Sequence, residues 1–251
     1  MRRSRADTML VERGLATTAD EAARLILAGR ARAGTARIKS PGELLSADAE
    51  LSLTEQARYV SRGGDKLAAA LDHFAISPNG RVCLDAGAST GGFTDCLLQR
   101  GAARVYAVDV GYGQLDWRLR GDARVVVLER TNVRELDAES LAPRPDLVVA
   151  DLAFIGLRTV LPVLRSFLQG EGEMVLLVKP QFELPREDVR GGVVTDAVLH
   201  RRAVDLVEEA ARTHGFDLIG DVESPLKGPK GNREFFVALR SGAQANSTGC
   251  K

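Results

Sequence analysis

The chain has 251 residues, of which 45% are hydrophobic and 5% aromatic, and this composition suffices for the buried core of an ordinary enzyme. Lysine and arginine together number 34, as do aspartate and glutamate, so the formal net charge is zero and a chain that is basic throughout is excluded. The charge is unevenly distributed, because residues 1–40 contain nine basic and four acidic side chains, a net of +5, and the remainder therefore carries −5. This asymmetry predicts a small basic module that docks on RNA, joined to a mildly acidic body; a solvated charged surface is the alternative.

Cysteine usage and hydropathy indicate a protein of the reducing cytoplasm. Cys83, Cys96 and Cys250 are too few for a disulfide framework and lack the spacing of metal ligands, so we expect no metal site. The basic N-terminus has no apolar segment of the kind that signal peptides carry. No run approaches the ~20 apolar residues that span a bilayer, since the best candidate, Leu147–Leu157, contains Asp151. We expect no membrane association.

The first 56 residues are predicted to form a small α+β domain. A helix over Asp7–Arg13 ends at Gly14, and a second helix begins at a capping box of Thr18 and Glu21. Two extended segments follow, Ala31–Lys39 and Glu50–Thr54, with a turn at residues 40–42 between them. Residues 57–62 are predicted to be a linker.

Beyond the linker, short apolar runs alternate with helical segments. Their uninterrupted apolar character is typical of strands buried on both faces of a parallel sheet. The predicted strands are Val82–Leu84, Val105–Val108, Val125–Leu128, Leu147–Ala150 and Met174–Val178, and the predicted helices include Phe93–Arg100 and Leu157–Leu168. The alternation predicts a doubly wound, Rossmann-like α/β domain over residues 63–240.

The C-terminal part of this domain has a different pattern. A long helix is predicted from Asp196 to Thr213, and it ends at Gly215. Two further extended segments, Asp217–Asp221 and Glu234–Leu239, are predicted to form an antiparallel hairpin at the edge of the sheet. The polar, Gly- and Ser-rich residues 241–251 are predicted to be a disordered tail.

A loop of small residues follows the first predicted strand of the body. Its sequence is Asp85-Ala86-Gly87-Ala88-Ser89-Thr90-Gly91-Gly92-Phe93-Thr94, which is neither G-x-G-x-x-G nor a P-loop. Small residues allow the backbone to approach a ligand, and Asp109, at the end of the second strand, can bind a ribose diol. This arrangement is typical of S-adenosylmethionine sites; a glycine-rich turn without a ligand is the alternative. The predicted cofactor-binding residues are Asp85, Gly87, Ser89, Thr90, Gly91, Gly92, Phe93, Asp109, Asn132 and Asp151.

Four charged residues stand at predicted strand ends or loop edges, where ligands meet an open α/β sheet. Asp151 closes the fourth strand, Lys179 closes the fifth and Glu234 opens the last, while Lys66 lies earlier, after Gly63 and Gly64. A single lysine after a buried strand is normally a surface residue. The joint occurrence of all four instead indicates a catalytic site.

The sequence resembles the TlyA (haemolysin A) family of 2′-O-ribose methyltransferases, whose catalytic domain is that of the FtsJ-like RNA methyltransferases. The resemblance covers residues 4–240 and depends on four long phrases. They are Val60-Ser61-Arg62-Gly63-Gly64, the loop from Cys83 to Thr94, Asp109-Val110-Gly111-Tyr112-Gly113-Gln114-Leu115 and Val178-Lys179-Pro180-Gln181-Phe182-Glu183. The first 56 residues resemble the S4 RNA-binding fold, through Leu10-Val11-Glu12-Arg13-Gly14-Leu15-Ala16 and Ala22-Ala23-Arg24-Leu25-Ile26.

The resemblance implies methylation of a ribose hydroxyl in ribosomal RNA (16S, 23S or both), with S-adenosylmethionine as cofactor and ribosomal subunits as partners. The family's Lys-Asp-Lys-Glu tetrad falls on Lys66, Asp151, Lys179 and Glu234. A ribose hydroxyl is a weak nucleophile, so the protein has to align it and accept its proton. We expect Lys179 to be the base, Asp151 to orient it, and Glu234 to hold Lys66 or a ribose hydroxyl. We expect a monomer that contacts RNA through Arg3, Arg5, Arg30, Arg32 and Arg62.

Three other functions are compatible with parts of the pattern. A membrane-active cytolysin is suggested only by the family's haemolysin label. An RNA-binding protein whose α/β domain has lost catalysis is the second alternative, and the intact tetrad argues against it. A dinucleotide oxidoreductase shares the fold class but has the G-x-G-x-x-G fingerprint that is missing here.

Trp117 is predicted to be a core aromatic, with a lid as the alternative, and His73, His200 and His214 are predicted to be structural or exposed.

Overall fold

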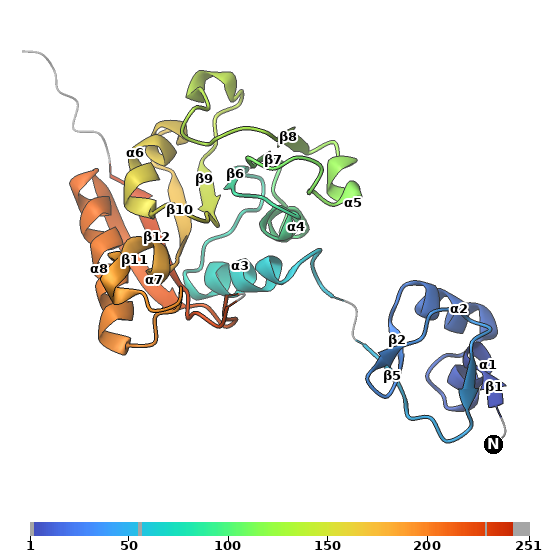
Figure 1. Cartoon of the computed structure of the whole chain (residues 1–251). Coiled ribbons are helices and arrows are strands. Elements are labelled where there is room, and N and C mark those ends of the chain that lie inside the picture. Colours follow the sequence, from blue (N-terminus) through green and yellow to red (C-terminus); the bar gives the residue numbers. More distant parts are fainter. Residues whose placement is uncertain (1–2, 55–56, 229, 243–251) are drawn as a thin grey trace, which may run out of the picture. The chain divides into compact units, whose positions relative to one another are not determined.

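The computed structural model describes residues 3–54, 57–228 and 230–242, and the chain divides into two compact units, Met1–Ala57 and Arg58–Lys251 (Figure 1). Each unit has its own buried core. Residues 243–251 of the predicted tail lie outside the described residues, whereas Ser241 is the last residue of a strand. Arg62, at the end of the predicted linker, is the first residue of helix α3 (Arg62–His73).

The N-terminal unit contains two helices and two small sheets. Helix α1 (Ala6–Glu12) packs against α2 (Ala19–Leu27), which starts where Thr18 Oγ1 accepts a hydrogen bond from the Glu21 amide at 3.1 Å. The strands are β1 (Arg3–Arg5), β2 (Ala31–Ala33), β3 (Ala36–Arg37), β4 (Leu44–Ser46) and β5 (Leu51–Leu53), which pair as β1-β4 and as β3-β2-β5. The two predicted extended segments pair with each other, as β2 with β5.

Two features of this unit differ from the expectation. The segment predicted as continuous over Ala31–Lys39 turns back on itself at Gly34, whose φ of +57° is accessible to glycine at little cost. The β1-β4 pair has no counterpart in the prediction, because strands of three residues leave too short a hydrophobic pattern to detect.

The second unit is built on a seven-stranded sheet of order β11-β12-β10-β9-β6-β7-β8 (Figure 1). Strands β6 to β10 run parallel, and β12 pairs antiparallel with both β10 and β11, so the Rossmann-like fold and the predicted edge hairpin are both confirmed. The strands are β6 (Val82–Ala86), β7 (Arg104–Val108), β8 (Val125–Leu128), β9 (Leu147–Ala150), β10 (Glu173–Val178), β11 (Phe216–Glu223) and β12 (Phe235–Ser241).

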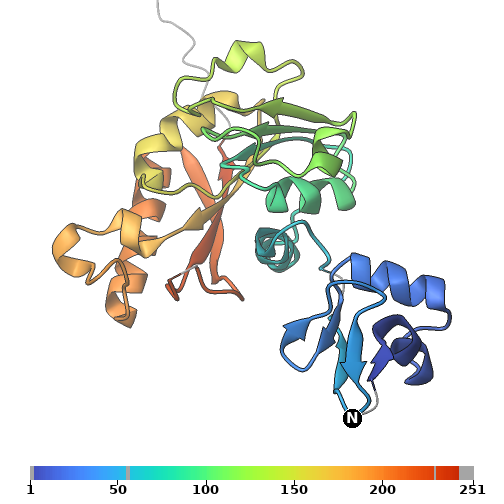
Figure 2. The ribbon, with the colours of Figure 1, turned by 45° about the vertical axis from the view of Figure 1, so that its right-hand side comes forward.

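Helices cover both faces of this sheet, as Figures 1 and 2 show. On one face α3 and α4 (Gly92–Gln99) pack over alternate strand residues such as Cys83; on the other, α6 (Leu157–Phe167) and α8 (Ala197–Thr213) pack over the intervening ones such as Leu84. Because both faces are buried, the strands need apolar residues at successive positions, which explains their uninterrupted hydrophobic runs. The remaining helical segments are α5 (Trp117–Arg120), α7 (Pro180–Glu183), η1 (Ala138–Ser140) and η2 (Arg186–Asp188).

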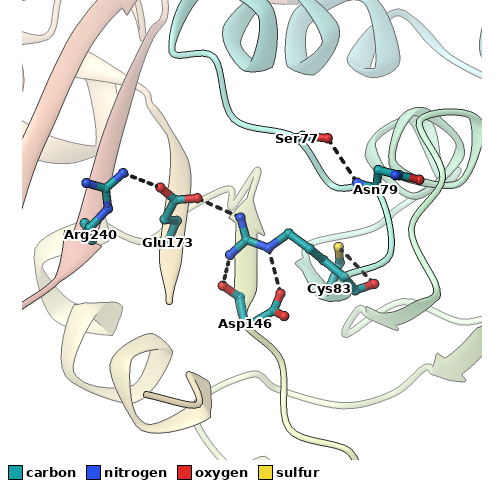
Figure 3. Close-up of polar contacts among 7 residues, drawn as sticks. Ser77, Asn79, Cys83, Asp146, Glu173 and Arg240 are labelled. Carbon is teal, nitrogen blue, oxygen red and sulfur yellow. Dashed lines mark hydrogen bonds and ion pairs between the residues drawn. The ribbon is translucent and has the colours of Figure 1, made fainter. Parts of the chain in front are cut away.

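The amino ends of the parallel strands are tied together by a partly buried ion-pair network (Figure 3). Arg81 Nε lies 2.8 Å from Asp146 Oδ1 and its Nη1 lies 2.6 Å from Glu173 Oε2, while Arg240 Nη2 contacts the other Glu173 oxygen at 2.8 Å. Cys83 lies near this network, and burial raises the pKa of its thiol to about 12, consistent with an unreactive core residue. The amino ends of the strands therefore have a structural role, and ligands are expected at the carboxyl ends.

Among the helices of the described residues, none is both long and apolar enough to cross a membrane.

Candidate active site

Charged residues meet at one end of the parallel strands, where β9 and β10 finish and β12 begins. Asp151 follows the last residue of β9, and Lys179 follows the last residue of β10. In the antiparallel register of β10 and β12, Val178 is opposite Phe235, so the next residues on the two segments are Lys179 and Glu234. Residues opposite one another in this way lie about 5 Å apart at Cβ. Three predicted residues, separated by up to 83 positions in sequence, thus meet here.

Lys179 and Asp151 form an ion pair in which Nζ lies 2.6 Å from Oδ1. Their side chains are 14% and 26% exposed, so the pair is partly accessible to a substrate. Among the described residues Asp151 Oδ1 has no hydrogen-bond partner, so this contact is an ion pair rather than a hydrogen bond. The pair places an amine and a carboxylate side by side at the carboxyl ends of β9 and β10.

Lys66 and Glu234 form a second pair, which is more deeply buried. Lys66 Nζ donates to Glu234 Oε2 at 2.6 Å, and the side chains are 9% and 1% exposed. Lys66 comes from the first half of α3, 168 positions before its partner. Burying two charges is costly unless they pair, so each of these residues requires the other. The four predicted catalytic residues are thus brought together as two ion pairs on neighbouring elements.

A pocket of about 800 Å³ opens next to the Lys179–Asp151 pair, and Asp151 is part of its wall. Five of the predicted cofactor-binding residues line it: Gly87, Ser89, Asp109, Asn132 and Asp151. Thr131, which the sequence predicts together with Asn132 to line an adenine pocket at the end of the third strand, also lines this pocket, as do Val108, Gln114, Val133, Leu152, Ile155 and Thr159. Gln114 lies within one of the phrases that carry the resemblance, as does Val110, which also lines the pocket. Val108 ends β7 and Thr159 lies in α6.

The other five predicted cofactor residues lie outside this lining. Asp85 and Phe93 are buried, and Phe93 packs near Phe236 with ring centroids 6.2 Å apart. The Thr90 carbonyl accepts a hydrogen bond from the Asp116 amide at 3.2 Å. A Cβ on Gly91 would collide with Leu115 and Leu119, and one on Gly92 with Ser61 and the backbone of Gly64, so both glycines permit close packing beneath the loop. These residues therefore support the conformation of the loop and do not line the pocket.

The pocket fits a nucleoside-containing cofactor. Asp109 accepts backbone hydrogen bonds from Ser89 at 2.8 Å and Gly111 at 2.6 Å, and each carboxylate oxygen retains a second acceptor position for a ribose hydroxyl. Val108, Val133 and Leu152 supply apolar surface for a base. The volume lies within the range of pockets for molecules of this size. The side chains present are therefore compatible with S-adenosylmethionine.

Gly87 brings the loop into close contact with the end of β9. Its φ is +87°, and a Cβ there would lie 2.5 Å from the Asp151 carbonyl oxygen. We expect Gly87→Ala to raise the Kd for S-adenosylmethionine at least about tenfold by calorimetry, and to cost about 1–3 kcal/mol of stability. Gly80→Ala is the control, because Gly80 has a φ of +74° but open space around it. An unchanged Kd for Gly87→Ala would show that this close approach is unimportant for binding.

Asp85 is a fully buried carboxyl group whose Oδ2 accepts a hydrogen bond from Thr94 Oγ1 at 2.7 Å, while Oδ1 has no partner. Burial raises the pKa of Asp85 to about 7, and the Thr94 hydrogen bond partly opposes this increase. Between about pH 4 and 7 the folded protein therefore retains a proton that the unfolded chain loses, so this group lowers stability progressively as the pH rises and has no further effect above about pH 7.

Asp85→Asn is expected to remove this pH dependence. Relative to wild type, its free energy of unfolding should increase between pH 5 and 7 by up to ~1.4 kcal/mol per pH unit, measured by urea titration. Asp72→Asn is the control, because Arg100 holds the pKa of Asp72 below its usual range and that carboxylate stays ionised throughout. Parallel curves for wild type and Asp85→Asn would contradict the assignment.

The arginines predicted to contact RNA lie at or near the surface. Arg3 is exposed on β1; Arg5 pairs with Asp7 at 2.6 Å; Arg30 Nε donates to the Thr54 carbonyl at 3.2 Å, and Arg32 Nη1 to the Thr35 carbonyl at 2.9 Å. Arg62 is exposed at the start of α3. Each unit therefore presents basic side chains to solvent.

Two secondary predictions have clear outcomes. Trp117 is 79% exposed, so its prediction as a core aromatic is wrong; it begins the four-residue helix α5, which buries only Leu119. His200 is buried, with Nε2 2.9 Å from the Val194 carbonyl oxygen, as expected for a structural histidine. In the part of the chain that the structure describes, no three His, Cys, Asp or Glu residues cluster in a way that could hold a metal ion.

The chain is similar to known proteins over most of its length. The family model described as FtsJ-like methyltransferase matches residues 59–241. A relative from Mycobacterium tuberculosis named 16S/23S rRNA (cytidine-2′-O)-methyltransferase TlyA is 52% identical over 243 residues, which are 96% of this chain and 91% of the relative.

Solved structures agree with this relationship. One from Streptococcus thermophilus, whose name carries the word hemolysin, has a TM-score of 0.74 and 40% identity, and the match covers 96% of this chain and 89% of that one. An S-adenosylmethionine-dependent methyltransferase from Mesorhizobium loti is only 19% identical, with a TM-score of 0.52 over 70% of this chain and 99% of its own, and shows that the fold is shared.

Proposed function

We propose that this chain, which belongs to the TlyA family of FtsJ-like methyltransferases, transfers a methyl group from S-adenosylmethionine to a ribose 2′-hydroxyl of ribosomal RNA. The M. tuberculosis relative is named for that reaction on cytidines of 16S and 23S RNA. The substrate proposed for this chain is accordingly the RNA of one or both ribosomal subunits, in the cytoplasm where ribosomes are found.

One observation carries the proposal: Asp151 belongs both to the wall of the pocket and to the ion pair with Lys179. A cofactor in the pocket would therefore lie next to the Lys179 amine, which can accept a proton. Positioning of this kind is a major contribution to catalysis when the reaction needs only alignment and one proton transfer.

In the proposed mechanism, the chain's own residues orient the ribose and move its proton. S-adenosylmethionine, when bound, supplies an electrophilic methyl group. Lys179, which is charged in the ion pair, first loses one proton to solvent; its neutral Nζ then accepts the hydroxyl proton, while Asp151 orients that nitrogen through their 2.6 Å contact. Lys66, held by Glu234, presents its remaining N–H groups toward the substrate oxygens. The burial of the second pair keeps it fixed while the first reacts.

The N-terminal unit is proposed to dock on RNA in the manner of an S4 domain, through Arg3, Arg5, Arg30 and Arg32, with Arg62 contributing from the second unit. Electrostatic contacts with phosphates carry much of the affinity of such modules and weaken with salt. Replacing these arginines should therefore raise KM for RNA without changing the Kd for S-adenosylmethionine.

The proposed function is tested by incubating the protein with tritiated S-adenosylmethionine and separately purified 30S and 50S subunits from a strain lacking the enzyme. Label on a ribose 2′-oxygen, located by nuclease digestion and mass spectrometry, is the expected result. Label on a base, or RNA binding without transfer, would refute ribose methylation, and the latter outcome would favour a non-catalytic RNA-binding protein.

A further inference from the structure

A buried carboxylate outside the tetrad connects the two segments that carry Asp151 and Lys179. Glu183 is the last residue of α7 and is only 3% exposed. Its Oε1 accepts a hydrogen bond from the Leu157 amide at 2.6 Å, and its Oε2 lies 3.3 Å from Arg158 Nε. Arg158 also donates from Nη2 to the Glu183 carbonyl at 2.7 Å. Glu183 thus caps the amino end of α6 from a different element.

The two connected segments are short. Asp151 lies six positions before Leu157, and Lys179 lies four positions before Glu183 and is the residue that precedes α7. Between Asp151 and α6 the chain passes through Phe154, whose φ of +65° is unusual for a residue with a side chain. Phe154 is 92% exposed, and its ring lies beside that of Phe182, with centroids 5.5 Å apart. A strained segment keeps such a conformation only when its surroundings enforce it.

The packing between these segments leaves little room for adjustment. A Cβ on Gly156, which precedes α6, would lie 3.0 Å from both Glu183 Oε2 and the Phe182 carbonyl oxygen. A buried carboxylate is costly, and burial raises the pKa of Glu183, although the Leu157 amide and Arg158 oppose this. The amino end of a helix offers free amides and a favourable dipole, which is the environment in which a carboxylate is best accommodated.

We propose that Glu183 is a positioning residue for the reaction: by fixing the start of α6 against α7, it holds Asp151 in contact with Lys179. This inference rests on the proposed function, because it concerns the geometry of the same proton-transfer pair. Glu183 does not line the pocket and acts through the two segments that it joins.

The test measures kcat, KM for RNA and the Kd for S-adenosylmethionine of Glu183→Ala, Glu183→Gln and Gly156→Ala, well below their melting temperatures. Glu183→Ala should lower kcat on the order of 100-fold, as expected for a displacement of about 1 Å at the reacting groups. KM and Kd should stay within about threefold. Glu183→Gln retains an acceptor for the Leu157 amide and should recover most of kcat. Gly156→Ala keeps the carboxylate but crowds it, and should lower kcat in the same direction.

Glu208→Ala is the matched control, because Glu208 is also a buried glutamate paired with arginines, Arg201 and Arg212, but lies in α8 outside the pocket. It should lose stability and keep its kcat. Wild-type kcat in Glu183→Ala, or in Gly156→Ala should the first variant fail to fold, would overturn the positioning role. An equal loss of kcat in Glu208→Ala would overturn it as well. No transfer by the wild type in the same assay would instead refute the proposed function, and the positioning role with it.

Discussion

Lys179→Ala is expected to lower kcat for methyl transfer by about 10²–10⁴-fold, the usual contribution of a positioned proton acceptor. Lys179 contacts Asp151 at 2.6 Å but does not line the pocket, so the Kd for S-adenosylmethionine should change by less than about threefold. Single-turnover transfer to purified subunits, together with calorimetric titration of the cofactor, measures both quantities.

The control for this variant is Lys227→Ala, which removes an exposed lysine outside both ion pairs. It should retain kcat within about threefold. A Lys179→Ala protein that turns over at the wild-type rate would contradict the assignment of Lys179 as the base, and a loss of cofactor binding would indicate that the substitution damages the pocket rather than the proton transfer.

The largest effect on stability is expected at the buried Lys66–Glu234 pair. Glu234→Leu or Lys66→Met alone leaves a charge without its partner at side chains 1–9% exposed, and should cost about 3–5 kcal/mol. The double variant, Lys66→Met with Glu234→Leu, removes both charges and should return to within about 2 kcal/mol of wild type. Its transferase activity should nevertheless remain abolished, because the pair is proposed to serve the reaction. Urea unfolding and the transfer assay separate the two effects.

An exposed pair provides the comparison. Arg202→Ala breaks an ion pair with Asp188 whose side chains are 53% and 25% exposed, and should cost less than about 1 kcal/mol. If the double variant were as active as the wild type, Lys66 and Glu234 would have no part in the reaction. If the double variant were as unstable as either single variant, the instability of the single variants would not come from an unpaired buried charge, and the prediction would be wrong.

The sequence predicts the body of this fold well because each parallel strand is buried on both faces. A run such as Leu147-Val148-Val149-Ala150 carries the signal without help from distant residues. The N-terminal unit was less predictable, since its strands are two or three residues long and a hairpin turns at Gly34 within one predicted segment. Strands this short are stabilised mainly by the strands with which they pair, and the local sequence pattern does not predict that pairing.

The candidate site shows the same limit. Strand-end positions identified Asp151 and Lys179, but the pairing of Lys66 with Glu234 spans 168 positions and was expected only from a family resemblance. In the cofactor loop, residue type alone could not separate Gly87 and Ser89, which line the pocket, from Gly91 and Gly92, which pack against other parts of the chain. Glu183 lies in one of the phrases that carry the resemblance, but its role could not be predicted from that phrase, because the role depends on α6, which begins 26 positions earlier.

The most direct test of the central claim uses an RNA in which one atom is missing. Once the methylated nucleotide is mapped, two subunits are reconstituted, one with ordinary RNA and one with a 2′-deoxy nucleotide at that position alone. Mass spectrometry should find one added methyl group on the ordinary RNA and none on the deoxy RNA, with binding of both unchanged. A methyl group on the deoxy nucleotide would place the reaction on the base and contradict the account.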